Sequence, residues 1–293
     1  MKKKLVFLVL GIVMAATPLQ ARTNVMVTVD NRIMTFPDAQ PFMDSNNRTL
    51  VPIRFISEEL GAKVDWDEKT KTVSIEQGEK NIEMKLGSSQ ITLDGQTKQM
   101  DTAPISKQNR TFVPLRFVSE GLGVNVDWLK EVSTVQISTG KEIKVTHIDN
   151  LKAEPISKYG NAFVRDGYKE VVIANLSQLP INDGEYTIHD ISVSEDGNQV
   201  YVTQTPNKDT WTYTNLYFSD SIGCKRARNP MKYTKKNGVV ISEYDVVGLS
   251  DYVFEGDNFE KYKLDKVNYF VFEGKDKLLA IPKSEVLKKW EKF

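Results

Sequence analysis

Residues 48–66 read RTLVPIRFISEELGAKVDW, and residues 110–128, 62 positions later, read RTFVPLRFVSEGLGVNVDW. Of the 19 aligned positions 13 are identical, which identifies an internal duplication. A supersecondary unit that occurs twice is expected to bury the apolar faces of its two copies together. The repeated positions that define the motif are Arg48, Pro52, Arg54, Phe55, Gly61, Asp65 and Trp66, then Arg110, Pro114, Arg116, Phe117, Gly123, Asp127 and Trp128.

Each copy is predicted to form a strand, a helix and a hairpin. Residues 49–51 form an extended run, because the proline that follows disfavours helix in its predecessor yet is tolerated in a first helical turn. Apolar residues within 53–60 recur at helical spacing, and Gly61 follows as a stop signal. Residues 64–75 then alternate between apolar and polar around a polar turn, which predicts a β-hairpin.

The similarity extends upstream, where residues 28–31 match residues 92–95. We therefore expect one α+β domain over residues 24–140, in which both copies share a sheet and both helices pack on it.

The duplicated pattern resembles the N-terminal "stalk" domain of copper amine oxidases, which also occurs in exported proteins of Gram-positive bacteria. The resemblance implies an α+β stalk-like domain at the cell surface. It does not imply the oxidase reaction, because the copper and quinone chemistry belongs to a separate catalytic domain.

The oxidase site itself is not predicted from this chain. Its copper needs three histidines, whereas the chain has two, His147 and His189. The family's quinone precursor is a tyrosine in an Asn-Tyr-Asp/Glu context, and here Asn268 and Tyr269 are followed by Phe270. We expect no copper, no other cofactor and no amine oxidase activity.

The first residues indicate export. Three lysines precede an apolar run over residues 5–16 that is too short to span a bilayer, so residues 1–21 are predicted to be a signal peptide. Its removal leaves 36 basic and 39 acidic side chains, a net charge of −3, which argues against a nucleic-acid partner. Cys224 is the only cysteine, so no intrachain disulfide can form, and it is expected to be a small buried residue.

Residues 145–293 show no repeat and no recognised family. Short β-branched and aromatic runs separated by Asn-Gly and Asp-Gly turns predict a mainly antiparallel β domain, ending in a helix capped by Ser284. The expected strands are residues 171–176, 187–193, 200–204, 211–218, 239–247, 269–272 and 278–281.

One predicted strand carries the best hint of a ligand. Alternation along a strand places Trp211, Tyr213, Asn215 and Tyr217 on one face. This row would either stack sugar rings, with the amide supplying hydrogen bonds, or be buried in the core of the sheet.

Other candidate groups favour structural roles. His147 and His189 lack a third ligand, and most acids, Asp183 among them, fall in turns where solvated positions are expected. Glu243 and Asp245 share a strand face and are the best available pair of acids for a glycosidase. The basic run over residues 225–228 would be either a solvated loop or a contact for anionic wall polymers.

The repeated charges allow two interpretations. We expect Arg54 to contact Asp65, and Arg116 to contact Asp127, so that each pair braces a helix against its hairpin. The alternative is a paired anion clamp. The tryptophans that follow the two aspartates are expected to lie in the core.

The sequence thus favours a non-enzymatic, exported module at the cell surface or cell wall, with no catalytic or metal-binding residues. Its expected partners are a cell-wall polymer, a glycan or a surface protein. The alternatives are a secreted hydrolase of wall glycan or peptide, with its site in residues 145–293, and a carbohydrate-binding protein that uses the aromatic strand.

Overall fold

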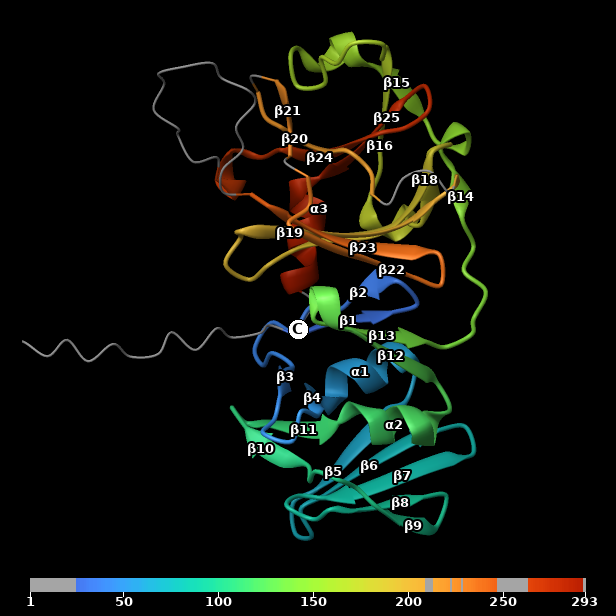
Figure 1. Ribbon diagram of the computed structural model, residues 1–293, viewed down its shortest axis with the longest axis vertical. Coiled ribbons are helices and arrows are strands. Elements are labelled where there is room, and N and C mark those ends of the chain that lie inside the picture. Colours follow the sequence, from blue (N-terminus) through green and yellow to red (C-terminus); the bar gives the residue numbers. More distant parts are fainter. Residues whose placement is uncertain (1–24, 209–212, 222, 228, 247–262, 292–293) are drawn as a thin grey trace, which may run out of the picture.

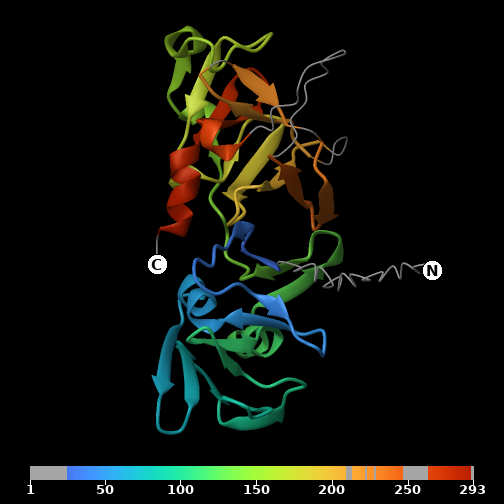
Figure 2. The same cartoon turned by 90° about the vertical axis from the view of Figure 1, so that its left-hand side faces the viewer.

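The computed structural model describes residues 25–208, 213–221, 223–227, 229–246 and 263–291. These residues form two β-rich lobes stacked along the long axis, with the C-terminal residues folded back to the boundary between them (Figures 1 and 2). We call residues 25–138 the repeat lobe and residues 146–291 the C-terminal lobe. The predicted signal peptide lies outside the described residues.

The two copies of the motif meet in the central sheet of the repeat lobe. β4 (Thr49–Pro52) and β11 (Arg110–Pro114) pair antiparallel, and Val51 lies directly opposite its equivalent, Val113. The pairing therefore relates the copies by a local two-fold axis. β3 (Phe42–Met43) and β10 (Ile105–Lys107) flank this pair at equivalent positions.

A short helix follows each central strand. α1 (Ile53–Leu60) and α2 (Leu115–Leu122) begin after a proline in extended conformation and end at a left-handed glycine, with φ of 75° at Gly61 and 67° at Gly123. A left-handed residue is readily adopted only by glycine, so the two glycines end the helices after eight residues.

The central strands of the two copies share a sheet, but the two hairpins do not, so the expectation of one sheet for both whole copies is wrong. β5 (Lys63–Asp67) and β6 (Thr72–Gln77) belong to a five-stranded sheet with β7 (Lys80–Lys85), β8 (Gln90–Leu93) and β9 (Gln96–Gln99). β12 (Asn125–Leu129) and β13 (Thr134–Ser138) pair instead with β1 (Met26–Val29) and β2 (Arg32–Ile33). The upstream strands of each copy thus complete the sheet of the other copy's hairpin.

The three sheets nevertheless enclose one apolar core. Ile56 and Leu60 of α1 lie in the same buried cluster as Val118 and Leu122 of α2, each 2% exposed or less. Burial of these side chains against one another makes each copy necessary for the other's stability.

The C-terminal lobe consists of two six-stranded sheets around a second core, and the prediction of a β-rich, mainly antiparallel structure is confirmed. Two strand pairs are parallel, β14 with β17 and β16 with β25. The strands of one sheet, in spatial order, are β14 (Thr146–His147), β17 (Ile181–Asn182), β18 (Tyr186–Val193), β19 (Gln199–Pro206), β23 (Val239–Asp245) and β22 (Lys232–Lys236). Those of the other are β15 (Ala153–Pro155), β16 (Glu170–Ile173), β25 (Leu278–Pro282), β24 (Tyr269–Glu273), β20 (Leu216–Ser219) and β21 (Cys224–Arg226).

The C-terminal helix begins earlier than expected. Pro282 occupies the N-cap of α3 (Lys283–Leu287), so the prediction that Ser284 caps the helix is wrong. The φ that proline fixes suits the entry to a helix, and Ser284 lies exposed within the first turn. The 3₁₀ turns are η1 (Lys130–Val132), η2 (Ile148–Asn150), η3 (Ile156–Tyr159), η4 (Leu176–Gln178), η5 (Leu264–Lys266) and η6 (Lys288–Trp290).

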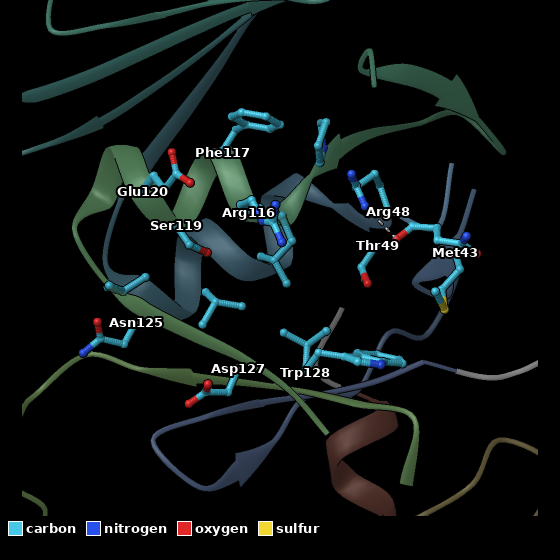
Figure 3. A pocket seen from close by; sticks show the side chains of 16 residues that line it. Met43, Arg48, Thr49, Arg116, Phe117, Ser119, Glu120, Asn125, Asp127 and Trp128 are labelled. Carbon is cyan, nitrogen blue, oxygen red and sulfur yellow. Dashed lines mark hydrogen bonds between the residues drawn. The ribbon is translucent and has the colours of Figure 1, made fainter. Parts of the chain in front are cut away.

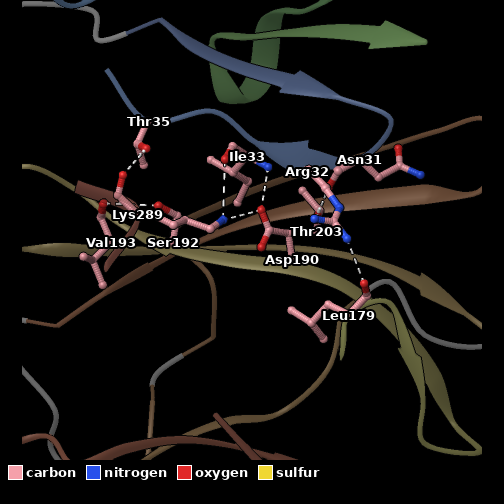
Figure 4. Close-up of polar contacts among 10 residues, drawn as sticks. All are labelled: Asn31, Arg32, Ile33, Thr35, Leu179, Asp190, Ser192, Val193, Thr203 and Lys289. Carbon is pink, nitrogen blue, oxygen red and sulfur yellow. Dashed lines mark hydrogen bonds and ion pairs between the residues drawn. The ribbon is translucent and has the colours of Figure 1, made fainter. Parts of the chain in front are cut away.

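Polar contacts hold the two lobes together where β2 meets β18 and η6 (Figure 4). A carboxylate oxygen of Asp190 accepts the backbone N–H of Ile33 at 2.7 Å and also binds the ammonium of Lys289. The Thr203 hydroxyl donates to the Asn31 carbonyl at 2.5 Å. No helix in the described ranges is long and apolar enough to cross a membrane.

Candidate functional site

The repeat lobe contains two pockets that are built from equivalent residues. Their volumes are about 520 Å³ and 760 Å³, and we call them the α2 pocket and the α1 pocket after the helix that each one borders. Eleven lining positions correspond between the α1 and α2 pockets: Pro52/Pro114, Ile53/Leu115, Arg54/Arg116, Phe55/Phe117, Glu58/Glu120, Val64/Val126, Trp66/Trp128, Val73/Val135, Asn109/Asn47, Arg110/Arg48 and Thr111/Thr49.

Each pocket combines residues from both copies of the motif. In the α2 pocket, Arg116 and Trp128 come from the second copy and Arg48 from the first, and the arginines face the indole across the cavity (Figure 3). In the α1 pocket, Arg110 of the second copy takes the place of Arg48. The antiparallel pairing of β4 with β11 causes this exchange, since it carries each strand's first residues to the helix of the other copy.

The tryptophans lie at the pocket walls, so their expected burial in the core is wrong. Trp66 is 39% exposed and Trp128 is 40% exposed. Val64 and Val126, two residues earlier on the same strand faces, are half-buried against the core. In each hairpin the valine packs against the core, and the tryptophan two residues later on the same face stays partly open to solvent.

The expected contacts between the motif's arginines and aspartates are absent among the described residues. Asp65 pairs with Lys63 at 2.6 Å, and Asp127 pairs with Lys236 of the C-terminal lobe. Neighbouring residues of a strand point to opposite faces, so each aspartate does not point in the direction of the tryptophan that follows it. Asp127 nevertheless lines the α2 pocket, where its carboxylate is paired with Lys236. Arg54 and Arg116 are exposed and form no ion pair within the described part of the chain.

The second arginine of each pocket is already neutralised. Arg48 donates to Asp101 at 2.5 Å, and Arg110 donates through Nε to Asp38 at 2.9 Å. Each pocket thus holds one arginine with an acidic partner and one whose charge an incoming anion could neutralise.

The first turns of the two helices add to this positive character. Neither α1 nor α2 has a side chain that caps its N-terminus, and neither first turn contains an acidic residue. Arg54 and Arg116 instead place a cation at the positive end of the helix dipole, an arrangement that is unfavourable without a nearby anion. Ser119 is 1% exposed and lines the α2 pocket, and its hydroxyl oxygen has no hydrogen-bond partner among the residues that the structure describes.

The pockets differ in how the indole is held. Trp66 Nε1 donates to a carboxylate oxygen of Glu68 at 2.7 Å. That carboxylate also binds Lys71, and hydrogen bonds from Lys71 and Trp66 lower the pKa of Glu68. The equivalent of Glu68 in the second copy is Lys130, so Trp128 has no such restraint.

The predicted aromatic row does not form a platform. Tyr217 is 1% exposed, and its hydroxyl accepts a hydrogen bond from Arg165 at 2.5 Å. Tyr213 precedes β20 and packs against Tyr233 with the rings tilted by 59° and their centroids 5.3 Å apart. Asn215 is hydrogen-bonded to Glu273 and Arg226. Trp211 lies outside the described residues. The strand begins at Leu216, so Tyr213 and Asn215 precede it and only Tyr217 lies on it.

The histidines do not come together as metal ligands. Burial lowers the pKa of His189 to about 4, and its Nε2 lies 2.7 Å from the Thr205 hydroxyl. His147 is exposed and accepts from the backbone N–H of Asp149 at 3.3 Å. Within the residues that the structure describes, no three His, Cys, Asp or Glu side chains gather as a metal site would require.

The remaining candidates have structural surroundings. Glu243 pairs with Lys232 at 3.5 Å across neighbouring strands. Cys224 is partly buried against apolar residues, and burial raises the pKa of its thiol to about 12. Within the basic run, Arg226 bonds to Asn215 at 2.7 Å, and residue 228 lies outside the described residues. Sequence reasoning missed the pockets because it assigned their arginines and tryptophans to internal packing.

Comparisons with known proteins agree with the resemblance seen in the sequence. The family model of the copper amine oxidase N-terminal domain matches residues 28–137. A curated relative from Brevibacillus choshinensis, described as a protease inhibitor, is 25% identical over 140 residues, which is 47% of this chain and 42% of the relative. The chain thus matches less than half of that relative's length. The matched family model is that of the N-terminal domain and not of the oxidase catalytic domain.

Proposed function

We propose that this protein is a non-enzymatic module, exported to the cell surface, that binds its partner through the α1 and α2 pockets. The observation that carries the proposal is the occurrence of the same pocket twice, each with an exposed tryptophan beside an arginine that forms no ion pair within the described residues. Exposed aromatic and arginine side chains in concave sites are typical of binding surfaces.

The stalk-like role implied by the family resemblance is compatible with this proposal. The lobes meet through buried polar contacts and a shared apolar cluster of Met26, Leu129, Val132 and Ile241, which would hold the C-terminal lobe at a fixed distance from a pocket-bound partner. The duplicated domain would then serve both as a spacer and as the attachment to the wall.

Localisation tests the first half of the proposal. Cells that express the full chain are fractionated into cytoplasm, membrane, wall and medium, and the chain is detected by immunoblot. We expect it in the wall fraction or the medium, and retention in the cytoplasm would contradict export.

Wall binding tests the second half. Purified protein is mixed with isolated cell walls, and the Trp66→Ala/Trp128→Ala variant is expected to lose most of its retention. Tyr233→Ala is the matched comparison, because Tyr233 is a 45% exposed aromatic residue outside both pockets. Loss of binding in Tyr233→Ala but not in the double variant would move the site to the C-terminal lobe.

Protease inhibition is a second candidate, favoured by the description of the curated relative. The full chain is titrated against proteases of the serine, cysteine, aspartic and metallo classes. Stoichiometric loss of protease activity in one class would support inhibition. If the double tryptophan variant inhibits equally well, the inhibitory site lies outside the two pockets. No inhibition in any class would exclude this candidate for the proteases tested.

A further inference from the structure

We propose that each pocket binds one carboxylated sugar unit of an acidic glycan, so that one chain has two such sites. This inference rests on the proposed function, because it names the ligand class of the same pockets. The argument depends on four matched features: the size of the cavity, the exposed indole, the exposed arginine and a glutamate one helical turn away from that arginine.

The cavities fit one or a few sugar rings. Volumes of about 520 Å³ and 760 Å³ lie within the range of roughly 300–1,000 Å³ that small-ligand sites occupy. Trp66 and Trp128 present flat, partly exposed rings at the walls. The C–H face of a sugar ring is apolar and rigid, so stacking on an indole buries area on both partners at little loss of conformational freedom.

The arginines select for a carboxylate. Arg54 and Arg116 hold planar guanidinium groups that can bind a carboxylate through two parallel hydrogen bonds. Their position in an uncapped first turn increases the benefit of an anion, because backbone N–H groups and the helix dipole also face it. An anion would therefore satisfy both the side chain and the helix start.

The glutamates limit how much negative charge the ligand can carry. Glu58 and Glu120 follow the arginines by four residues, so each shares a helix face with its arginine, and both are exposed pocket residues. A carboxylate accepts hydrogen bonds from sugar hydroxyls but repels a second anionic group. This combination favours a hydroxylated ring with one acidic substituent over a densely charged phosphate polymer.

Further polar groups lie where sugar hydroxyls would reach them. Asn47 and Asn109 adopt equivalent left-handed turns, with φ of 57° and 56°, and their exposed amides line the pockets. The Ser119 hydroxyl, buried and without a partner, supplies a further donor and acceptor in the α2 pocket.

Calorimetric titration of the full chain tests the proposal with three probes of matched length. The probes are an oligogalacturonate, a neutral galacto-oligosaccharide and an oligoglutamate peptide. We expect oligogalacturonate to saturate two sites per chain. The neutral oligosaccharide should bind at least about tenfold more weakly, since it lacks the charge-assisted hydrogen bond, which contributes roughly that factor. The peptide keeps the carboxylate but has no sugar ring to stack on the indole, so it should also bind more weakly.

Single variants assign the sites. Arg54→Gln and Arg116→Gln are each expected to leave one site per chain, and the double variant none. Lys98→Gln is the matched control, because Lys98 is an exposed cation on β9 that lines neither pocket. Circular dichroism of each variant separates loss of binding from loss of folding.

Three results would overturn the inference. Equal binding of the neutral oligosaccharide would show that the arginines do not select for a carboxylate. Equal or tighter binding of the peptide would show that the pockets recognise the acidic group and not the sugar ring. Absence of saturable oligogalacturonate binding would reject the ligand class, while wall retention that still depends on Trp66 and Trp128 would leave the proposed function standing.

Discussion

At the scale of residues, burial gives the carboxyl group of Asp183 a different environment from the solvated one expected for its turn position. Asp183 is 1% exposed, not solvated as its turn position suggested. One of its oxygens accepts the backbone N–H groups of Glu185 at 2.9 Å and Tyr186 at 2.7 Å, while the other has no partner in the described part of the chain. Burial raises the pKa of Asp183 to about 6, and the backbone hydrogen bonds oppose that rise only in part.

We expect Asp183→Asn to stabilise the protein at neutral pH. Because the folded state favours the protonated carboxyl, this group's contribution to stability is complete below pH 4 and is lost as pH rises through about 6. Asparagine keeps a carbonyl acceptor without the charge, so its unfolding free energy at pH 7 should exceed that of the wild type by up to about 3 kcal/mol. Urea unfolding at pH 4 and pH 7 measures this difference.

Asp196→Asn is the control of opposite sign. Burial alone would raise the pKa of Asp196, but hydrogen bonds from Ser194 and Asn198 lower it further than burial raises it. The charged form is therefore favoured in the folded state. This variant should lose stability at pH 7 and differ least from the wild type at low pH. A similar loss of stability in both variants at pH 7 would contradict the assigned environments.

At the scale of elements, the helices show where the duplicated motif has diverged. Gly121 of α2 occupies the position of the exposed Glu59 in α1. A Cβ atom at Gly121 would lie 2.4 Å from Cδ1 of Ile82 and 2.9 Å from Leu93, because α2 packs directly on β7 and β8. The additional strand β7 therefore explains why the second copy requires glycine in mid-helix.

Alanine at these equivalent positions should have different effects. Gly121→Ala is expected to lower the unfolding free energy by about 1–3 kcal/mol through overpacking, although alanine is the better helix former by about 1 kcal/mol. Glu59→Ala should change stability by no more than about 0.5 kcal/mol. Denaturant titration of both variants checks this, and a more stable Gly121→Ala would show that α2 is not held against β7 as described.

For the whole molecule, one buried ion pair stands out among the contacts that join the two lobes. The side chains of Asp190 and Lys289 are 6% and 15% exposed, and Lys289 also accepts the Thr35 hydroxyl through its carbonyl at 2.9 Å. The C-terminal turn η6 thereby connects β18 to the first hairpin of the repeat lobe (Figure 4).

Asp190→Ala should weaken the coupling between the lobes. The substitution removes the buried carboxylate that both the Lys289 ammonium and the Ile33 backbone N–H contact, so a loss of about 3–5 kcal/mol is expected. Calorimetry should show one melting transition separating into two. Asp149→Ala, which removes an ion pair with Lys277 whose aspartate is 58% exposed, should change stability by no more than about 1 kcal/mol. An unchanged single transition in Asp190→Ala would show that other contacts set the orientation.

The sequence by itself determined the local structure of this protein. Repetition, a proline before each helix and a glycine after it indicate two eight-residue helices, since these signals act through neighbouring residues. Alternation and turn residues likewise predicted strands near 187–193 and 278–281, where the structure has β18 and β25. The same local reasoning failed for residues 213–215, which precede β20, because the start of this strand depends on its pairing with β24.

Only the tertiary structure decided which side chains meet. The antiparallel pairing of β4 with β11 brings an arginine of one copy to the helix and tryptophan of the other. Asp65 and Asp127 pair with lysines and not with the arginines of the motif. Each pocket thus takes its helix and tryptophan from one copy and its second arginine from the other copy. Local patterns fix the conformation of each segment, whereas the faces that it buries or exposes depend on packing between segments distant in the chain.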